Sequence, residues 1–118
     1  MSGHTIVHVD ISANNQEETG KFYESLFGWK IQPMPQFNYT TFTAESGPGG
    51  GFMQIGDGMA PAGQVLVYVY TDDIDASLAK VESLGGKTVV PKTEIPTVGW
   101  FGVFTDLADN QLALFTSI

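Results

Sequence analysis

The chain has 118 residues, no cysteine and a formal net charge of −8 at pH 7. This length suits one domain with a single modest core, and the lack of cysteine excludes disulfides, thiolate nucleophiles and cysteine metal ligands. The acidic field repels nucleic acid and anionic lipid, so we expect neither as a partner and favour a neutral or cationic small ligand.

The N-terminal stretch MSGHTIVHVD contains no basic segment followed by an apolar run, so it does not resemble a signal peptide. The apolar runs of the chain are too short to span a membrane, and we expect a cytoplasmic location. Alternating residues predict a strand over TIVHVDI, with His8 and Asp10 on one face and Val7, Val9 and Ile11 on the other. The valine face suits packing against a helix.

The segment NNQEETGKFYESLFG predicts a helix over residues 14–28. Phe22 and Leu26 are four residues apart, with Tyr23 and Thr19 beside them, and these residues form one apolar stripe that we expect to face the core. Asn14 would begin this helix and Gly28 would end it. The extended stretches WKIQPM, FNYTTFT and GGFMQI follow as three predicted strands.

The second half of the chain repeats this order of elements. A strand is predicted over QVLVYVY, a helix over TDDIDASLAKVESLGG, and further strands over KTVVPK, WFGVFT and NQLALF. Ile74, Leu78 and Val81 form the apolar stripe of the second helix, and Asp73 lies at its N-terminal end.

A short repeated word supports an internal duplication. Glu24–Gly28 reads ESLFG, and Glu82–Gly86 reads ESLGG 58 positions later. Together with the matched order of elements, it predicts two tandem βαβββ modules within one domain. We place the first module at about residues 1–59 and the second at about 60–118 of the domain 1–118.

Three stretches resemble the vicinal oxygen chelate superfamily of glyoxalase I, bleomycin-resistance proteins and extradiol dioxygenases: FYESLFGW, DDIDASLAKVESLGG and EIPTVGWFGVFTDLADNQLALF. The resemblance covers essentially the whole chain and is closest to the short, single-domain glyoxalase-related proteins. It implies an α+β fold in which the two βαβββ modules form one curved mixed sheet around a U-shaped cleft. It also implies a homodimer.

Strand alternation predicts which side chains line that cleft. The wall would combine apolar and polar groups, as small-molecule sites do. The stretch TEIPTVGWFG would either carry Trp100 on a lid over the cleft or form a long hairpin turn. The expected ligand-binding residues are His8, Asp10, Phe52, Gln54, Leu66, Tyr68, Trp100, Ala113 and Phe115.

The resemblance also gives four metal-ligand positions, which fall at His8, Gln54, Leu66 and Ala113. Leu66 and Ala113 have no atoms that coordinate a metal, and a glutamine carbonyl is a weak ligand for zinc, nickel or iron. We therefore expect no cofactor. A divalent metal, if one binds, would use His8 and Gln54.

Two functions of different classes follow from the resemblance. In the first, the protein binds a small organic molecule in the inter-module cleft without the family's full metal site, as bleomycin-resistance members do. In the alternative, it is a glyoxalase-like lyase or isomerase, or a dioxygenase-related enzyme, that uses His8 with a weakly held divalent metal. His8 is thus the candidate catalytic residue, and its structural alternative is a histidine hydrogen-bonded to a neighbour such as Gln54.

Overall fold

The computed structural model describes residues 3–55 and 63–118, which contain two α-helices and eight strands. Contacts between residues divide the chain into two compact units. One consists of His8–Leu66, and the other of the residues up to Val7 together with Val67–Ile118. The expected module boundary near residues 59 and 60 lies outside the described residues.

The first module contains one helix and a four-stranded mixed sheet. Its strands are ordered β2-β3-β4-β1, with β1 parallel to β4 and the other neighbours antiparallel. Its elements are β1 (Ile6–Ala13), α1 (Gln16–Phe27), β2 (Lys30–Met34), the short 3₁₀ helix η1 (Pro35–Phe37), β3 (Tyr39–Thr43) and β4 (Gly49–Gln54).

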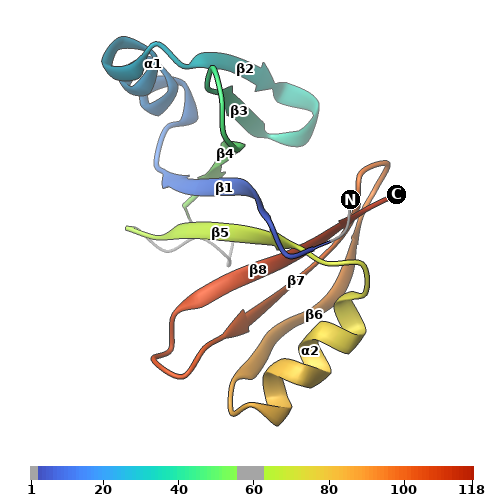
Figure 1. The fold of residues 1–118 in the computed structure, drawn as a ribbon. Helices are drawn as coiled ribbons and strands as arrows, with labels where there is room; N and C mark the ends of the chain where they lie inside the picture. The colour runs from blue at the N-terminus through green and yellow to red at the C-terminus, as the bar shows by residue number, and fades with distance from the viewer. Residues whose placement is uncertain (1–2, 56–62) are drawn as a thin grey trace. The chain divides into compact units, whose positions relative to one another are not determined.

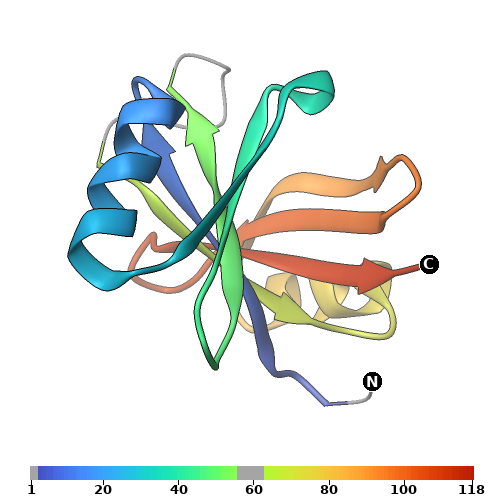
Figure 2. The same ribbon diagram turned by 90° about the horizontal axis from the view of Figure 1, so that it is seen from above.

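The second module repeats this topology. Its strands are ordered β5-β8-β7-β6, so in both modules the first strand pairs in parallel with the fourth. Its elements are β5 (Val65–Tyr70), α2 (Ile74–Ser83), β6 (Lys87–Ile95), β7 (Gly99–Thr105) and β8 (Gln111–Ser117). Each helix packs on the sheet of its own module (Figures 1 and 2). The predicted α+β fold of two βαβββ modules is confirmed.

Both helices begin at side chains that cap their free amides. Asn15, one residue after the predicted start, accepts a hydrogen bond from the Glu18 amide at 3.0 Å. Asp73 does the same for the Ala76 amide at 3.0 Å. Gly28 ends α1 as predicted, with a φ of 76° that favours glycine and an N–H that donates to the Glu24 carbonyl.

The predicted core face of α1 is correct for Tyr23 but wrong for Phe22 and Leu26. Phe22 and Leu26 are 60% and 58% exposed. Gly20 is the buried residue of the helix, and a Cβ there would approach Ile31 Cγ2 of β2 to 2.9 Å. This close approach turns Gly20 and Tyr23, three residues apart, toward the sheet. Phe22 and Leu26 consequently point away from it.

Tyr23 joins the core of the first module. Its ring stacks on Phe52 and on Trp29, with centroids 5.8 and 5.2 Å apart. The buried members of this cluster are Ala13, Phe42 and Phe52. The second module has its own cluster of Ile74, Leu78 and Leu114, which confirms that Ile74 and Leu78 face the core.

A tight turn joins β7 to β8 at Asp106–Asn110. The Asp106 carboxylate accepts hydrogen bonds from the Asn110 side chain and from the Asn110 and Ala108 amides. These bonds, that from the Asn110 side chain first, lower the pKa of Asp106 below its usual value. Elsewhere, neither of the described helices has the length and apolarity needed to cross a membrane.

Candidate functional site

Three polar side chains meet on one face of the first module. His8 and Asp10 come from β1 and Tyr39 comes from the start of β3. His8 Nε2 lies 2.9 Å from Asp10 Oδ1 and 2.8 Å from the Tyr39 hydroxyl oxygen. The Tyr39 hydroxyl also donates a hydrogen bond to Asp10 Oδ1. We call His8, Asp10 and Tyr39 the polar cluster.

The hydrogen bonds of the polar cluster assign the protonated nitrogen of a neutral His8 ring. The Tyr39 hydroxyl gives its proton to Asp10, so it has none to donate to His8. His8 Nε2 must therefore carry a proton and donate it toward the two oxygens.

Burial differs sharply between the members of the polar cluster. The Asp10 side chain is 7% exposed, whereas the His8 side chain is 33% exposed. A buried carboxylate needs hydrogen-bond donors, and His8 and Tyr39 supply them. Asp10 and Tyr39 thus hold the His8 ring in place while part of that ring remains accessible.

A glycine makes room for Tyr39 in this cluster. Gly51 of β4 is in register with Asp10 of β1 and with Thr41 of β3. A Cβ at Gly51 would overlap the Tyr39 phenol ring and its hydroxyl. The ring can therefore cross β4 to reach Asp10 only because residue 51 has no side chain.

Tyr39 was missed as a site residue in the sequence. Within FNYTTFT, alternation places Phe42 on one face and Tyr39 on the other. Phe42 is buried in the core on the α1 side, so the sequence did contain the signal that Tyr39 shares the face of His8 and Asp10.

The expectation that Phe52 and Gln54 point to the same side as His8 is wrong. In the parallel pairing of β1 with β4, Phe52 is in register with Ile11 and Gln54 with Ala13. Phe52 is fully buried against Tyr23 on the α1 side. Alternation along β4 shows that Phe52 and Gln54 share a face but not which face of the sheet it is. The register of β4 with β1 determines that face.

The proposed pairing of His8 with Gln54, whether around a metal or by a direct hydrogen bond, is likewise not found. The Gln54 amide donates to the Asn14 carbonyl at 2.7 Å, and its oxygen faces Gln16 Nε2 at 3.4 Å. Within residues 3–55 and 63–118, no group of three or more His, Cys, Asp or Glu side chains is placed to hold a metal ion. The residues at the family's ligand positions therefore do not fit its metal centre, and a metal-free protein stays a prediction.

The expected site residues of the second module lie on β5 and β8. Tyr68 is in register with Ala113, and Tyr70 with Phe115, so these side chains share one face of the sheet. Leu66 and Ala113 are 1% and 0% exposed. Ligand binding by Leu66, Tyr68, Ala113 and Phe115 stays a prediction.

Trp100 does not lie on a lid. Ile95 of β6 pairs with Gly99 of β7, and residues 96–98 form the hairpin turn between them. Trp100 is a residue of β7 that packs against the cluster of Ile74, Leu78 and Leu114. Its ring also lies 5.2 Å from Lys92 Nζ. The turn is over before Gly99, so Trp100 belongs to β7 and its side chain follows the alternation of that strand.

Comparisons with known proteins agree with this fold. The family model for the glyoxalase-like domain matches residues 6–115. A protein of Mycobacterium tuberculosis (strain CDC 1551 / Oshkosh), whose name assigns it provisionally to the glyoxylases, is 32% identical over 91% of this chain. The chain spans 43% of that relative's length. A glyoxylase-like domain-containing protein of Didymella fabae is 30% identical over 92% of this chain and 90% of its own.

A solved structure shares the fold at low sequence identity. It is a glyoxalase/bleomycin resistance protein/dioxygenase superfamily member from Vibrio splendidus, with a TM-score of 0.67 and 10% identity over 96% of this chain and 98% of that one. The chain therefore belongs to the glyoxalase-like domain family, within the vicinal oxygen chelate superfamily that its sequence resembles.

Proposed function

We propose that this protein binds a small organic molecule through the face of the first module that carries the polar cluster. The observation that carries the proposal is the buried Asp10 carboxylate, which together with Tyr39 orients a partly exposed His8 ring. An imidazole held in this way recognises a hydrogen-bonding group of a ligand without losing rotamer freedom on binding.

The charge of the protein narrows the ligand class. A net charge of −8 repels anions, so a neutral or cationic ligand is favoured. Because Nε2 of a neutral His8 ring carries the proton, Nδ1 is an acceptor, so a ligand hydroxyl or N–H group is a suitable partner, and an aromatic ring would add apolar contact area. Phenols and other small neutral aromatic compounds with a hydroxyl or N–H group are therefore the first ligands to test.

The test compares the two histidines of the chain. A thermal-shift screen of such compounds supplies a ligand, and calorimetric titration then measures its affinity for the wild type, His8→Ala and His4→Ala. Losing one hydrogen bond should weaken binding by His8→Ala about two- to tenfold. His4 is exposed and makes no described contact with the polar cluster, so His4→Ala should bind as the wild type does.

Melting temperatures separate a binding role from a structural one. His8 is partly exposed, so we expect His8→Ala to cost no more than about 1 kcal/mol of folding free energy. A His8→Ala protein that melts far below the wild type yet keeps its affinity would make His8 a structural residue and would contradict the proposal.

The second candidate function is catalysis by a glyoxalase-like lyase or isomerase, or by a dioxygenase-related enzyme. The oriented His8 favours it, because a general base needs a defined geometry. Elemental analysis of protein purified without chelators distinguishes the two candidates. We expect well under one transition-metal ion per chain, and a stoichiometric ion lost in His8→Ala would support the enzyme instead.

A further inference from the structure

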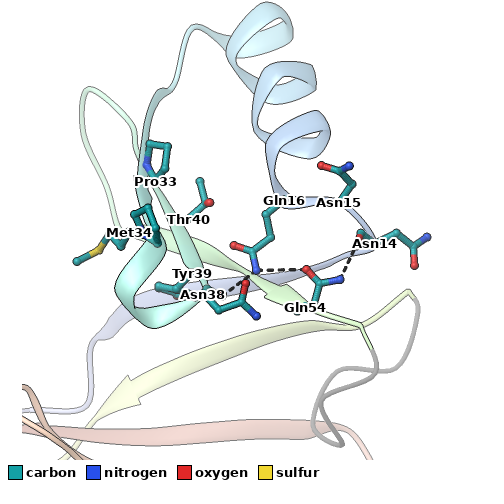
Figure 3. Close-up of a pocket in the computed structure, with 10 residues that line it drawn as sticks. Asn14, Asn15, Gln16, Pro33, Met34, Asn38, Tyr39, Thr40 and Gln54 are labelled. Carbon is teal, nitrogen blue, oxygen red and sulfur yellow. Dashed lines mark hydrogen bonds between the residues drawn. The ribbon is translucent and has the colours of Figure 1, made fainter.

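A pocket of about 320 Å³ lies in the first module between the start of α1 and the connection from β2 to β3 (Figure 3). This volume is at the lower end of the range for small-molecule sites. Five carboxamides and one threonine hydroxyl supply most of its polar lining: Asn14, Asn15, Gln16, Asn38, Gln54 and Thr40. We propose that this amide pocket is a second binding site, for a neutral, hydroxyl-rich molecule such as a monosaccharide or a cyclic polyol.

Gln16 occupies the centre of the amide pocket. Its Nε2 donates to the Asn38 carbonyl at 2.9 Å and faces Gln54 Oε1 at 3.4 Å. Figure 3 shows its side chain reaching from α1 toward these two residues. The Gln54 amide is held in turn by the Asn14 carbonyl. The pocket thus has fixed amide groups, which lowers the entropy cost of binding.

Thr40 is the second observation that points to a ligand. It is 7% exposed, and its register with Phe52 puts its side chain on the α1 face of the sheet, where the pocket lies. Among the described residues, no hydrogen bond involves the Thr40 hydroxyl, and this oxygen is not one of the fully buried polar atoms that lack a partner, so it keeps accessible surface. A group that enters the pocket can therefore donate a hydrogen bond to this hydroxyl or accept one from it.

The lining determines the charge of the ligand. Of the described residues that line the pocket, Tyr39 alone has a side chain that titrates. The net charge of −8 disfavours anions, and the positive end of the α1 dipole disfavours cations. A neutral molecule remains.

The lining also determines the functional groups of the ligand. Each carboxamide presents a donor and an acceptor side by side, and a hydroxyl can both donate and accept. Pro33 and Pro35 form an apolar part of the wall, which suits the C–H face of a sugar ring. Hydroxyl-rich rings combine both properties.

The test titrates ¹⁵N-labelled protein with D-glucose, D-galactose and myo-inositol, and with the charged analogues D-gluconate and D-glucosamine. We expect at least one neutral probe to shift the side-chain amide signals of Gln16, Asn38 and Gln54 saturably. The charged analogues should bind at least about tenfold more weakly. Thr40→Val keeps the shape of the side chain but removes its hydroxyl, and should weaken binding about two- to tenfold.

Two further variants decide the remaining outcomes. Gln16→Glu keeps the side-chain length but adds a charge and removes the central donor, so it should weaken binding even if Thr40→Val fails to fold. Thr41→Val makes the same change as Thr40→Val on the opposite face and should leave sugar binding unchanged. The proposal is overturned if no neutral probe saturates, if charged analogues bind equally well, or if Gln16→Glu binds as the wild type does.

This site and the polar cluster can fail separately. Gln16 and Thr40 are not part of the polar cluster, and His8 does not line the amide pocket. Tyr39 contributes to both and is therefore left unchanged in these tests. His8→Ala should keep its sugar affinity, and loss of that affinity in His8→Ala would show one continuous site.

Discussion

Gly51, which has no side chain, leaves the space that the Tyr39 ring of the polar cluster occupies. The Tyr39 ring reaches Asp10 by crossing β4 at Gly51, where a Cβ would overlap it. Because the ring lies against the β4 backbone at Gly51 and its hydroxyl is bonded to the buried Asp10 carboxylate, the ring cannot move aside cheaply. The glycine-rich start of β4 therefore has a packing role in the site.

We predict that Gly51→Ala destabilises the protein by about 1–3 kcal/mol, the usual cost of overpacking. The methyl group should push the Tyr39 ring away from Asp10. Urea unfolding of the wild type, Gly51→Ala, Tyr39→Ala and the double variant measures this as a double-mutant cycle. In the Tyr39→Ala background the glycine substitution should cost much less, and an equal cost in both backgrounds would show that the two residues do not interact.

At the residue scale, the sequence predicted side-chain direction only where a strand carried its own pattern. His8 and Asp10 alternate with valines and isoleucine, and they do share one face. Phe52 follows three glycines, which have no side chains to set a pattern, and its direction depends on pairing with β1. Alternation could place Tyr39 on the face of His8 and Asp10, but its contacts with them join residues 29 and 31 positions apart, and a local pattern does not predict such contacts.

At the scale of elements, the local sequence predicts the ends of the helices but not the buried face of α1. Gly28 and the Asn and Asp caps follow from local chemistry, so the ends of both helices could be predicted within about three residues. The buried face of α1 could not. Gly20 brings the backbone of α1 onto Ile31, and this contact turns Gly20 and Tyr23 toward the sheet. Phe22 and Leu26, the more apolar residues of the predicted stripe, are left exposed.

Adjacent aromatic residues of α1 provide a matched test. We predict that Tyr23→Ala lowers the free energy of unfolding by about 2–4 kcal/mol, because it removes a ring stacked on Phe52 and Trp29. Phe22→Ala makes the same kind of change at a 60% exposed position and should cost within about 1 kcal/mol. Chemical denaturation of both variants measures the difference, and a larger loss in Phe22→Ala would restore the stripe that the sequence indicates.

At the scale of the whole molecule, the duplication explains why the fold was the most predictable feature. Each module repeats the same order of elements, and the observed strand order repeats with it. The order of elements is predicted twice, once from each half of the chain, and the two predictions support each other. Each site residue, in contrast, is predicted from a single position.

We predict that the two modules unfold together. A unit of about 60 residues buries too little surface to be stable with a wide margin. One of the two units is also built from both ends of the chain, because the residues up to Val7 belong with Val67–Ile118. Within this unit the Tyr70 amide donates to the Thr5 carbonyl at 2.8 Å. The unit that contains Val67–Ile118 is therefore not continuous in the chain, and it needs the residues that precede His8 to be complete.

The two tryptophans report on the modules separately. Trp29 packs in the core of the first module and Trp100 in that of the second, and the chain has no other tryptophan. Trp100→Phe leaves the first probe and Trp29→Phe leaves the second. In urea, the fluorescence midpoint of each variant should coincide with its own far-ultraviolet circular dichroism midpoint, as a two-state transition requires. If fluorescence and dichroism separate in either variant, the modules unfold independently, and the duplicated units are then stable domains on their own.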